Sequence, residues 1–278
     1  MTSWARAAGI SLLFTLVLIA GGPAGCHSAS NRLSTSSSAG VAGNWQFTVT
    51  YGKVSKVPIG ADLTTSGGSI SGVAQVQKTF SGGCDANNCC GGPFSEFDRL
   101  VTGSVDGSGN LTLRSVVPGG GPVFSMTGYT SHGSMAQGNF TLSGSCPAQG
   151  TITGTRIAAL HGTYAGTLTS ETTGENFGIL VTLNQSKALN PKGSFNVSGG
   201  ARLQRYSCLS SARIAAPLDH NSGLLGNAFK VTMKSSAGGA MLGLTGTIEQ
   251  DGQTLKTTYA VIGGSCHNDF GKGTLTLQ

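Results

Sequence analysis

The sequence predicts an all-β protein made of two tandem, homologous antiparallel meander domains of about eight strands each. The first observation is a repeat, because Phe124–Gly128 and Leu142–Cys146 return as Leu242–Gly246 and Ile262–Cys266, at offsets of 118 and 120 positions. The second is a period-two alternation of apolar and polar residues, which is typical of strands with one buried face. The third is that short turns separate these runs, and short turns join antiparallel neighbours. Eight meandering strands favour a closed barrel, with a two-sheet β-sandwich as the alternative.

The first 25 residues are typical of an export signal. Arg6 gives a cationic start, and the apolar run Gly9–Ala20 is short for a membrane span. Ala24-Gly25-Cys26 follows, and here the chain resembles a bacterial lipoprotein signal, in which cleavage precedes a cysteine that becomes lipidated. Pro23 departs from the Leu that the family prefers at this position, so ordinary signal-peptidase cleavage nearby is the alternative. The resemblance implies lipidation of Cys26 and a membrane partner through the lipid anchor.

The rest of the chain divides into a tether and two repeats. Residues 26–42 hold the cysteine and a Ser-, Ala- and Gly-rich segment, typical of a flexible tether that spans roughly 20 Å as a random coil. Residues 43–157 and 158–278 are the two predicted barrels. Lipoproteins with Asp directly after the lipidated cysteine tend to stay at the inner membrane. His27 occupies that position, so the resemblance implies a cell-envelope protein anchored in the outer membrane.

The opening strand of each repeat shows the alternation and a second resemblance. In Gly43–Tyr51 one apolar face is expected to be buried, consisting of Trp45, Phe47, Val49 and Tyr51. Gly43-Asn44-Trp45 resembles the start of the calycins, the lipocalin and avidin-like barrels, whose first strand begins Gly-x-Trp. Gly162-Thr163-Tyr164 in the second repeat departs by its Tyr. The resemblance implies a barrel and leaves ligand binding open.

Six cysteines remain after Cys26, and an even number in an exported chain predicts disulfides. They are Cys84, Cys89, Cys90, Cys146, Cys208 and Cys266. The second repeat contains only Cys208 and Cys266, so these two are expected to pair. By equivalence Cys146 should pair with one cysteine of the 84–90 cluster, and the two left over should close a small loop. A zinc site in that cluster is the alternative, but it lacks a second spaced pair and a nearby His, so no metal or cofactor is expected.

Groups that could carry catalysis are sparse. The candidate sets are Asp219-His220 with Ser222 for a nucleophilic triad, Glu96 with Asp98 for acid/base work, and Asp85, Asn87 and Asn88 for calcium. The serine lacks a nucleophile-elbow context, the acids lie beside a turn, and the calcium spacing is incomplete. No catalytic residue is therefore predicted, and a hydrolase is the least favoured class.

The charge pattern argues against nucleic acid as a partner and suggests an anionic envelope polymer instead. Seventeen Lys and Arg against eleven Asp and Glu give +6, without the basic stripe and interleaved aromatics of nucleic-acid binders. Residues 84–106 carry four acids and one Arg, whereas the matched residues 187–213 carry five basic residues and no acid. These surfaces either dock the two domains together or give the second repeat a patch for an anionic envelope polymer; the alternative is two solvated faces that drifted apart.

These features together favour an exported, lipid-anchored envelope protein whose two barrels bind a small apolar ligand or an envelope glycan. A structural or adhesive surface spacer without a ligand is the alternative function. The interior decides between them, because a roomy, aromatic-lined cavity favours a ligand and a filled one favours a spacer.

Overall fold

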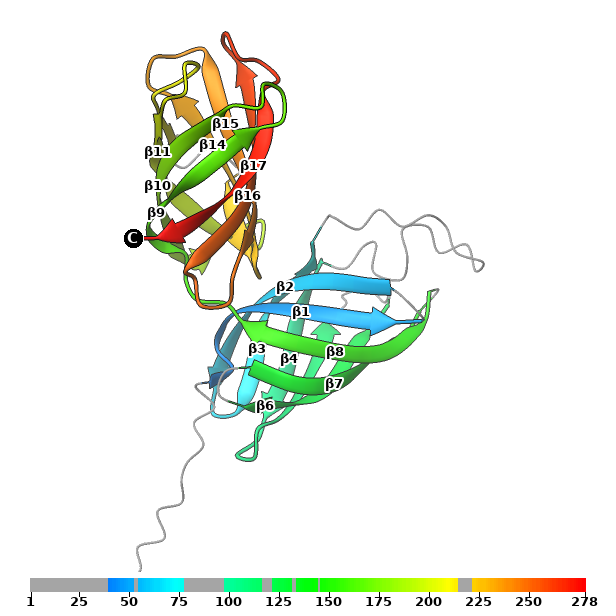
Figure 1. Ribbon diagram of the computed structural model, residues 1–278. Helices are drawn as coiled ribbons and strands as arrows, with labels where there is room; N and C mark the ends of the chain where they lie inside the picture. Colours follow the sequence, from blue (N-terminus) through cyan, green and yellow to red (C-terminus); the bar gives the residue numbers. More distant parts are fainter. Residues whose placement is uncertain are drawn as a thin grey trace, which may run out of the picture. The chain divides into compact units, whose positions relative to one another are not determined.

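Both repeats fold as closed antiparallel β-barrels (Figure 1). The computed structural model describes residues 40–52, 55–77, 98–116, 122–131, 134–144, 146–214 and 222–278. Seventeen strands and no α-helix occur in this part of the chain. Within the same ranges, no helix has the length and apolar character needed to cross a membrane. The predicted pair of tandem barrels is confirmed, and the β-sandwich alternative is wrong.

The first barrel is a simple meander of eight strands. They are β1 (Gly43–Tyr51), β2 (Ser55–Ser66), β3 (Ser69–Val76), β4 (Asp98–Val105), β5 (Asn110–Val116), β6 (Phe124–Ser131), β7 (Ser134–Leu142) and β8 (Ala148–Arg156). Each strand pairs with the next in chain order, and β1 pairs with β8 to close the ring. Closure leaves the sheet without free edges, which an open sheet would have to protect.

The second barrel repeats this plan with one strand position divided. Its strands are β9 (His161–Ser170), β10 (Asn176–Leu189), β11 (Phe195–Gln204), β12 (Ser211–Ile214), β13 (Gly223–Leu225), β14 (Ala228–Ser235), β15 (Ala240–Ile248), β16 (Thr254–Gly263) and β17 (Phe270–Leu277). Both β12 and β13 pair with β11 and β14, so these two short strands share a single position. The pairing of β9 with β17 closes the ring of eight positions.

The start of the first barrel follows the predicted alternation and begins earlier than expected. Trp45, Phe47 and Val49 are buried, and Tyr51 is half-buried. The indole N–H of Trp45 donates to the carbonyl oxygen of Val41 at 2.7 Å, and Val41 is itself buried. A buried indole N–H needs an acceptor, so the last residues of the expected tether belong to the packed domain.

The matched position in the second barrel shows how Tyr replaces Trp. Tyr164 is fully buried, and its hydroxyl donates to the carbonyl oxygen of Gly252 at 2.8 Å. Trp45 and Tyr164 thus fill equivalent places and satisfy their polar groups with different backbone carbonyls. Each barrel encloses its own separate hydrophobic core.

Turn chemistry explains where the strands reverse. The β2–β3 hairpin pairs Ser66 with Ser69 around Gly67 and Gly68, whose φ angles are 56° and 84°. Two consecutive positive φ values match a type I′ turn, which suits the twist of a hairpin and which glycine adopts without strain. Between β4 and β5 the Asp106 carboxylate accepts the backbone N–H groups of Ser108 and Asn110 and closes that turn.

Candidate functional site

The described residues of the first barrel enclose a small apolar void. The apolar void among its described residues, lined by side chains such as Phe47, Leu63 and Met126, measures about 10 Å³. A void of roughly this size holds about one water-sized probe, whereas ligand pockets measure about 300–1,000 Å³. The described residues therefore leave no room for a small apolar ligand in this void.

The second barrel holds a buried carboxylate in the turn between β16 and β17. Asp269 is 6% exposed. One carboxylate oxygen accepts a hydrogen bond from Ser170 Oγ at 2.6 Å. The other accepts hydrogen bonds from the hydroxyls of Tyr206 at 2.5 Å and Tyr259 at 2.9 Å. Ser170 ends β9, Tyr206 follows β11 and Tyr259 lies in β16, so three segments distant in sequence meet here; we call these four residues the Asp269 cluster.

Aromatic packing fixes the two tyrosines of the cluster. The ring of Phe177 stacks on Tyr206 with centroids 4.1 Å apart and meets Tyr259 edge-on at 5.2 Å. Stacked and edge-to-face contacts stabilise aromatic pairs beyond the apolar area that they bury. Both phenol groups are therefore held toward the carboxylate from the side of the core.

Two loops deliver Tyr206 and Asp269, and a disulfide joins them. Cys208 and Cys266 form the predicted bridge, with Cα atoms 5.6 Å apart. Arg205 and Asn268, the residues directly before Tyr206 and Asp269, have φ angles of 60° and 71°. Positive φ is uncommon for a residue with a side chain, more so for Arg than for Asn, and persists where surrounding contacts determine the conformation.

Electrostatics keep the cluster in one protonation state. Burial raises the pKa of Asp269, but the hydrogen bonds from Ser170, Tyr206 and Tyr259 outweigh burial and hold the pKa below its ordinary value. Burial, together with the hydrogen bond to Asp269 and its negative charge, raises the pKa of both phenols. The carboxylate thus stays ionised as an acceptor and the tyrosines stay protonated as donors. With both oxygens engaged, the cluster is suited to holding loops together and poorly suited to transferring protons.

Among the described residues, the outer surface of the second barrel carries a group of cations that form no salt bridge. Exposed cations project from β11, β12 and β14; we call Arg202, Arg213, Lys230 and Lys234 the basic wall. Arg213 lies directly opposite Lys234 across the β12–β14 pair. Strands β10 to β14 contain no acidic residue. Like charges directly opposite each other destabilise a sheet, so this arrangement costs stability.

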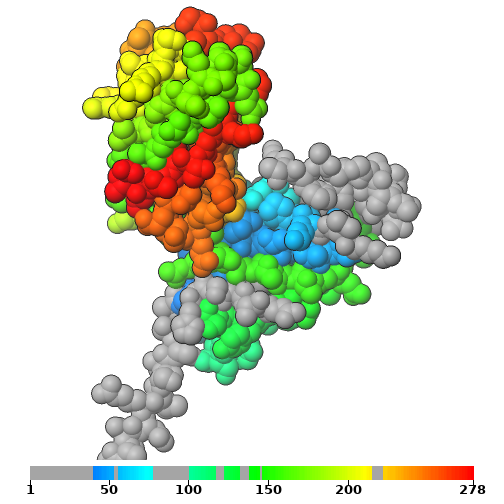
Figure 2. All heavy atoms as spheres, in the orientation of Figure 1, coloured from blue at the N-terminus to red at the C-terminus, as the bar shows by residue number. Residues whose placement is uncertain are grey.

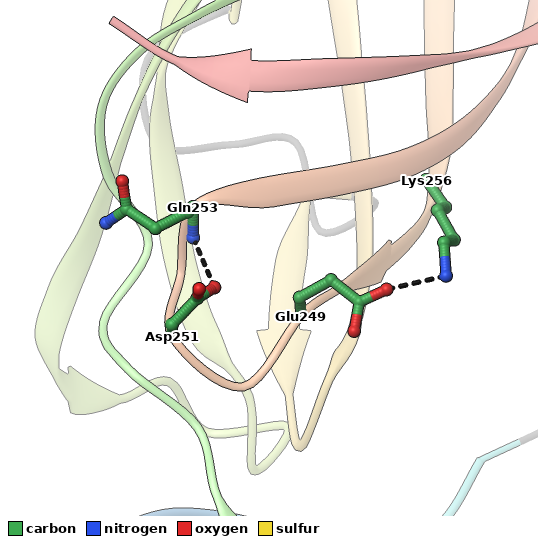
Figure 3. A network of polar contacts seen from close by, with 4 residues as sticks. All are labelled: Glu249, Asp251, Gln253 and Lys256. Carbon is green, nitrogen blue, oxygen red and sulfur yellow. Dashed lines mark hydrogen bonds and ion pairs between the residues drawn. The ribbon is translucent and has the colours of Figure 1, made fainter.

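The lysines of the neighbouring strands β16 and β17 differ from the basic wall because they form salt bridges. Lys256 pairs with Glu249 at 2.6 Å (Figure 3), and Lys272 pairs with Glu171 at 2.9 Å. These are the salt bridges found among the described residues, and neither involves the basic wall. Within the described ranges, positive charge on the second barrel is therefore paired with acids beside β16 and β17, and no such pair occurs over β11 to β14.

The structure places the remaining sequence candidates as follows. Ser222 is buried and its Oγ accepts the backbone N–H of Thr232, which gives it a structural role. Cys146 is disulfide-bonded, and its expected partners Cys84, Cys89 and Cys90 lie outside the described residues. Also outside them are Cys26, Asp85, Asn87, Asn88, Glu96 and Asp219-His220, and the side chain of Asp98. In the described ranges no three His, Cys, Asp or Glu side chains gather as metal ligands would.

The fold and these sites define a protein of two tandem antiparallel barrels with a basic outer wall on the second. No protein-family model and no curated protein matches the chain. One similar solved structure is a DUF3598-family protein of unknown function from Nostoc punctiforme, with 8% identity over 86% of this chain and 97% of that chain and a TM-score of 0.29. Another is kievitone hydratase from Nectria haematococca, with 11% identity over 88% and 92% and a TM-score of 0.25. At these values neither likeness bears on the function of this chain.

Sequence reasoning missed the Asp269 cluster. Its members are spread from Ser170 to Asp269, and no local spacing links them. One available sign was proximity to the disulfide, because Tyr206 and Asp269 lie two and three residues from Cys208 and Cys266. Polar residues beside an expected bridge are brought together with it.

Proposed function

We propose that the protein is an exported, lipid-anchored cell-envelope protein whose second barrel binds an anionic envelope polymer on its basic wall. The observation that carries the proposal is the direct opposition of Arg213 and Lys234 on a surface whose strands contain no acid. An arrangement that costs stability without an anion gains it when an anionic partner lies across the two cations.

Other features support parts of this proposal. The export signal and Cys26 favour a place in the envelope, and the Cys208–Cys266 bridge suits an oxidising compartment. The small size of the void among the described residues of the first barrel disfavours a small apolar ligand there and supports binding at the outer surface instead. The proposed role is binding rather than catalysis, because the oxygens of the Asp269 carboxylate are occupied by hydroxyl donors.

Charge reversal tests the proposal with a matched control. The double variant Arg213→Glu/Lys234→Glu should lose most binding to polygalacturonate and to poly-L-glutamate, measured by calorimetry at low and physiological salt. The control Lys256→Glu/Lys272→Glu changes net charge equally but alters lysines already paired with glutamates, so it should bind nearly as well. Binding by the unaltered protein should weaken with added salt, because exposed charges are screened.

Two results would oppose the proposal. Absence of binding by the unaltered protein would favour the alternative role of a surface spacer without a ligand. Equal losses in the test and control variants would mean that overall charge, and not the basic wall, governs binding.

A further inference from the structure

The second barrel exposes a small apolar surface next to the Asp269 cluster. Phe270 and Ile262 are 50% and 49% exposed, although both lie in regular strands. Alternation explains their direction, since the adjacent Asp269 and Val261 point into the barrel. Figure 2 shows strands β16 and β17, coloured orange to red, at the surface of the second barrel. Exposed apolar side chains scattered singly are normal on a protein surface, whereas adjoining ones with polar neighbours are a feature of ligand-binding surfaces.

The register brings these side chains beside two small residues. Ala260 is the cross-strand partner of Phe270, and Gly243 is the partner of Ala260 on the other side. Ile262 follows on the same face of β16 as Ala260, so it lies diagonally from Phe270. We call Gly243, Ala260, Ile262 and Phe270 the apolar platform.

Gly243 leaves the centre of the apolar platform without a side chain, and its backbone conformation does not require glycine. Its φ is not positive, and a Cβ placed there would meet only the carbonyl oxygen of Ala260, at an ordinary 3.7 Å. At Gly246, on the inward-facing side of the same strand, an added Cβ would by contrast lie 2.0 Å from a backbone oxygen. A side chain would therefore fit at position 243, and its absence leaves a level surface between Ala260 and β14.

Polar groups surround the platform on two sides. On one side, the hydroxyls of Thr245 and Thr258 are hydrogen-bonded to each other at 2.9 Å, and Lys230 is the next partner along that row. On the other side, Ile262, Met241, Lys234 and Arg213 are successive cross-strand partners. Adjacent strands lie about 4.8 Å apart, which places Lys234 roughly 10 Å from the Ile262 strand.

This combination fits a carboxylated sugar. A pyranose ring has an apolar C–H face that packs on an aromatic or aliphatic side chain, and hydroxyls at its edge that pair with polar neighbours. The platform supplies the apolar floor, Thr245 and Thr258 supply hydroxyls, and Lys234 and Arg213 supply cations for carboxylates farther along the polymer. A protein partner fits less well, because stable protein interfaces bury about 800 Å² on each side, far more than two large side chains provide.

We propose that the apolar platform is a sugar-stacking subsite that makes the second barrel selective for an acidic polysaccharide. This inference rests on the proposed function, because the basic wall supplies the attraction to the polymer. The Asp269 cluster and the Cys208–Cys266 bridge position the platform, since Asp269 directly precedes Phe270. The second barrel is selective because a charged polymer without sugar rings binds the basic wall but has no apolar ring face to stack on Phe270.

Two platform variants and two polymers test the inference. Phe270→Ser removes the stacking group, and Gly243→Leu fills the floor at a position where the backbone tolerates a side chain. Each should weaken binding to polygalacturonate roughly three- to tenfold. Binding to poly-L-glutamate of equal charge should not change. Tyr129→Ser, which removes a 47% exposed aromatic ring from the first barrel, is the control and should leave both affinities unchanged.

The outcomes separate this inference from the proposed function. If both platform variants bind polygalacturonate as the unaltered protein does, while Arg213→Glu/Lys234→Glu still abolishes binding, the subsite is wrong and the basic wall stands. If Phe270→Ser weakens binding to both polymers equally, the proposed stacking on a sugar ring is wrong as well. If the unaltered protein binds neither polymer, both ideas fail. Unfolding transitions of the two variants within about 1 kcal/mol of the unaltered protein would show that the barrel is intact.

Discussion

Replacing Asp269 by Asn should destabilise the second barrel and leave the first unchanged. The carboxylate accepts three hydroxyl donors, and hydrogen bonds to charged groups contribute about 1.5–3 kcal/mol each. Asn keeps one acceptor oxygen and presents an NH₂ group to hydroxyls that must rotate to accept from it. We therefore expect a net loss of about 3 kcal/mol, which for a domain of this size lowers the melting temperature by about 10 °C.

The chain carries its own reporter and control for this measurement. Trp45 is the tryptophan of the first barrel, and Trp4 lies in the N-terminal segment that we propose is removed on export, so fluorescence of a chain that starts at residue 26 follows the first barrel alone. Calorimetry then assigns the other transition to the second barrel. Asp251→Asn removes the same charge from an exposed turn, where the carboxylate accepts the backbone N–H of Gln253 (Figure 3), and should cost less than about 0.5 kcal/mol.

The pH dependence of the same variant adds an independent check. The folded-state pKa of Asp269 lies below its unfolded value, so its stabilisation is complete above the ordinary carboxyl pKa of about 4. It is lost as pH falls through the lower folded-state pKa. The stabilities of the unaltered protein and Asp269→Asn should converge in that acidic range. The reasoning is wrong if Asp269→Asn costs no more than Asp251→Asn at neutral pH, or if the Trp45 transition shifts with it.

Two further predictions follow from the structure and a third from the sequence. Replacing Cys208 and Cys266 by Ser opens a link between residues 58 positions apart and should cost the second barrel about 4 kcal/mol in denaturant titrations, with an unchanged Trp45 transition as the contrasting control. The phenols of Tyr206 and Tyr259 have raised pKa values, so their contribution persists below about pH 10 and is lost as pH rises through the folded-state values. Their phenolate absorbance should appear only with unfolding, and native ionisation near pH 10 would contradict the cluster. Cys26→Ser should move the protein from the detergent phase to the aqueous phase in Triton X-114 partitioning, whereas equal partitioning of both forms would argue against lipidation.

The sequence by itself determined the strands, their duplication and one disulfide. Alternation of apolar residues, as in Phe177, Ile179, Val181 and Leu183, is a local property of a strand with one buried face, and all four are buried. Glycine pairs mark tight turns because few other residues tolerate positive φ. The Cys208–Cys266 bridge followed from having only two cysteines in the second repeat.

Only the tertiary structure decided what the second barrel presents inside and outside. The Asp269 cluster draws on β9, β16 and the loop after β11, so its existence depends on which strands become neighbours when the ring closes. Cross-strand register places Arg213 opposite Lys234. It also brings together Gly243, Ala260 and Phe270. A shift of one residue would turn each side chain to the other face of its strand. Local patterns fix which residues can face outward, and the pairing of distant strands fixes which of them meet.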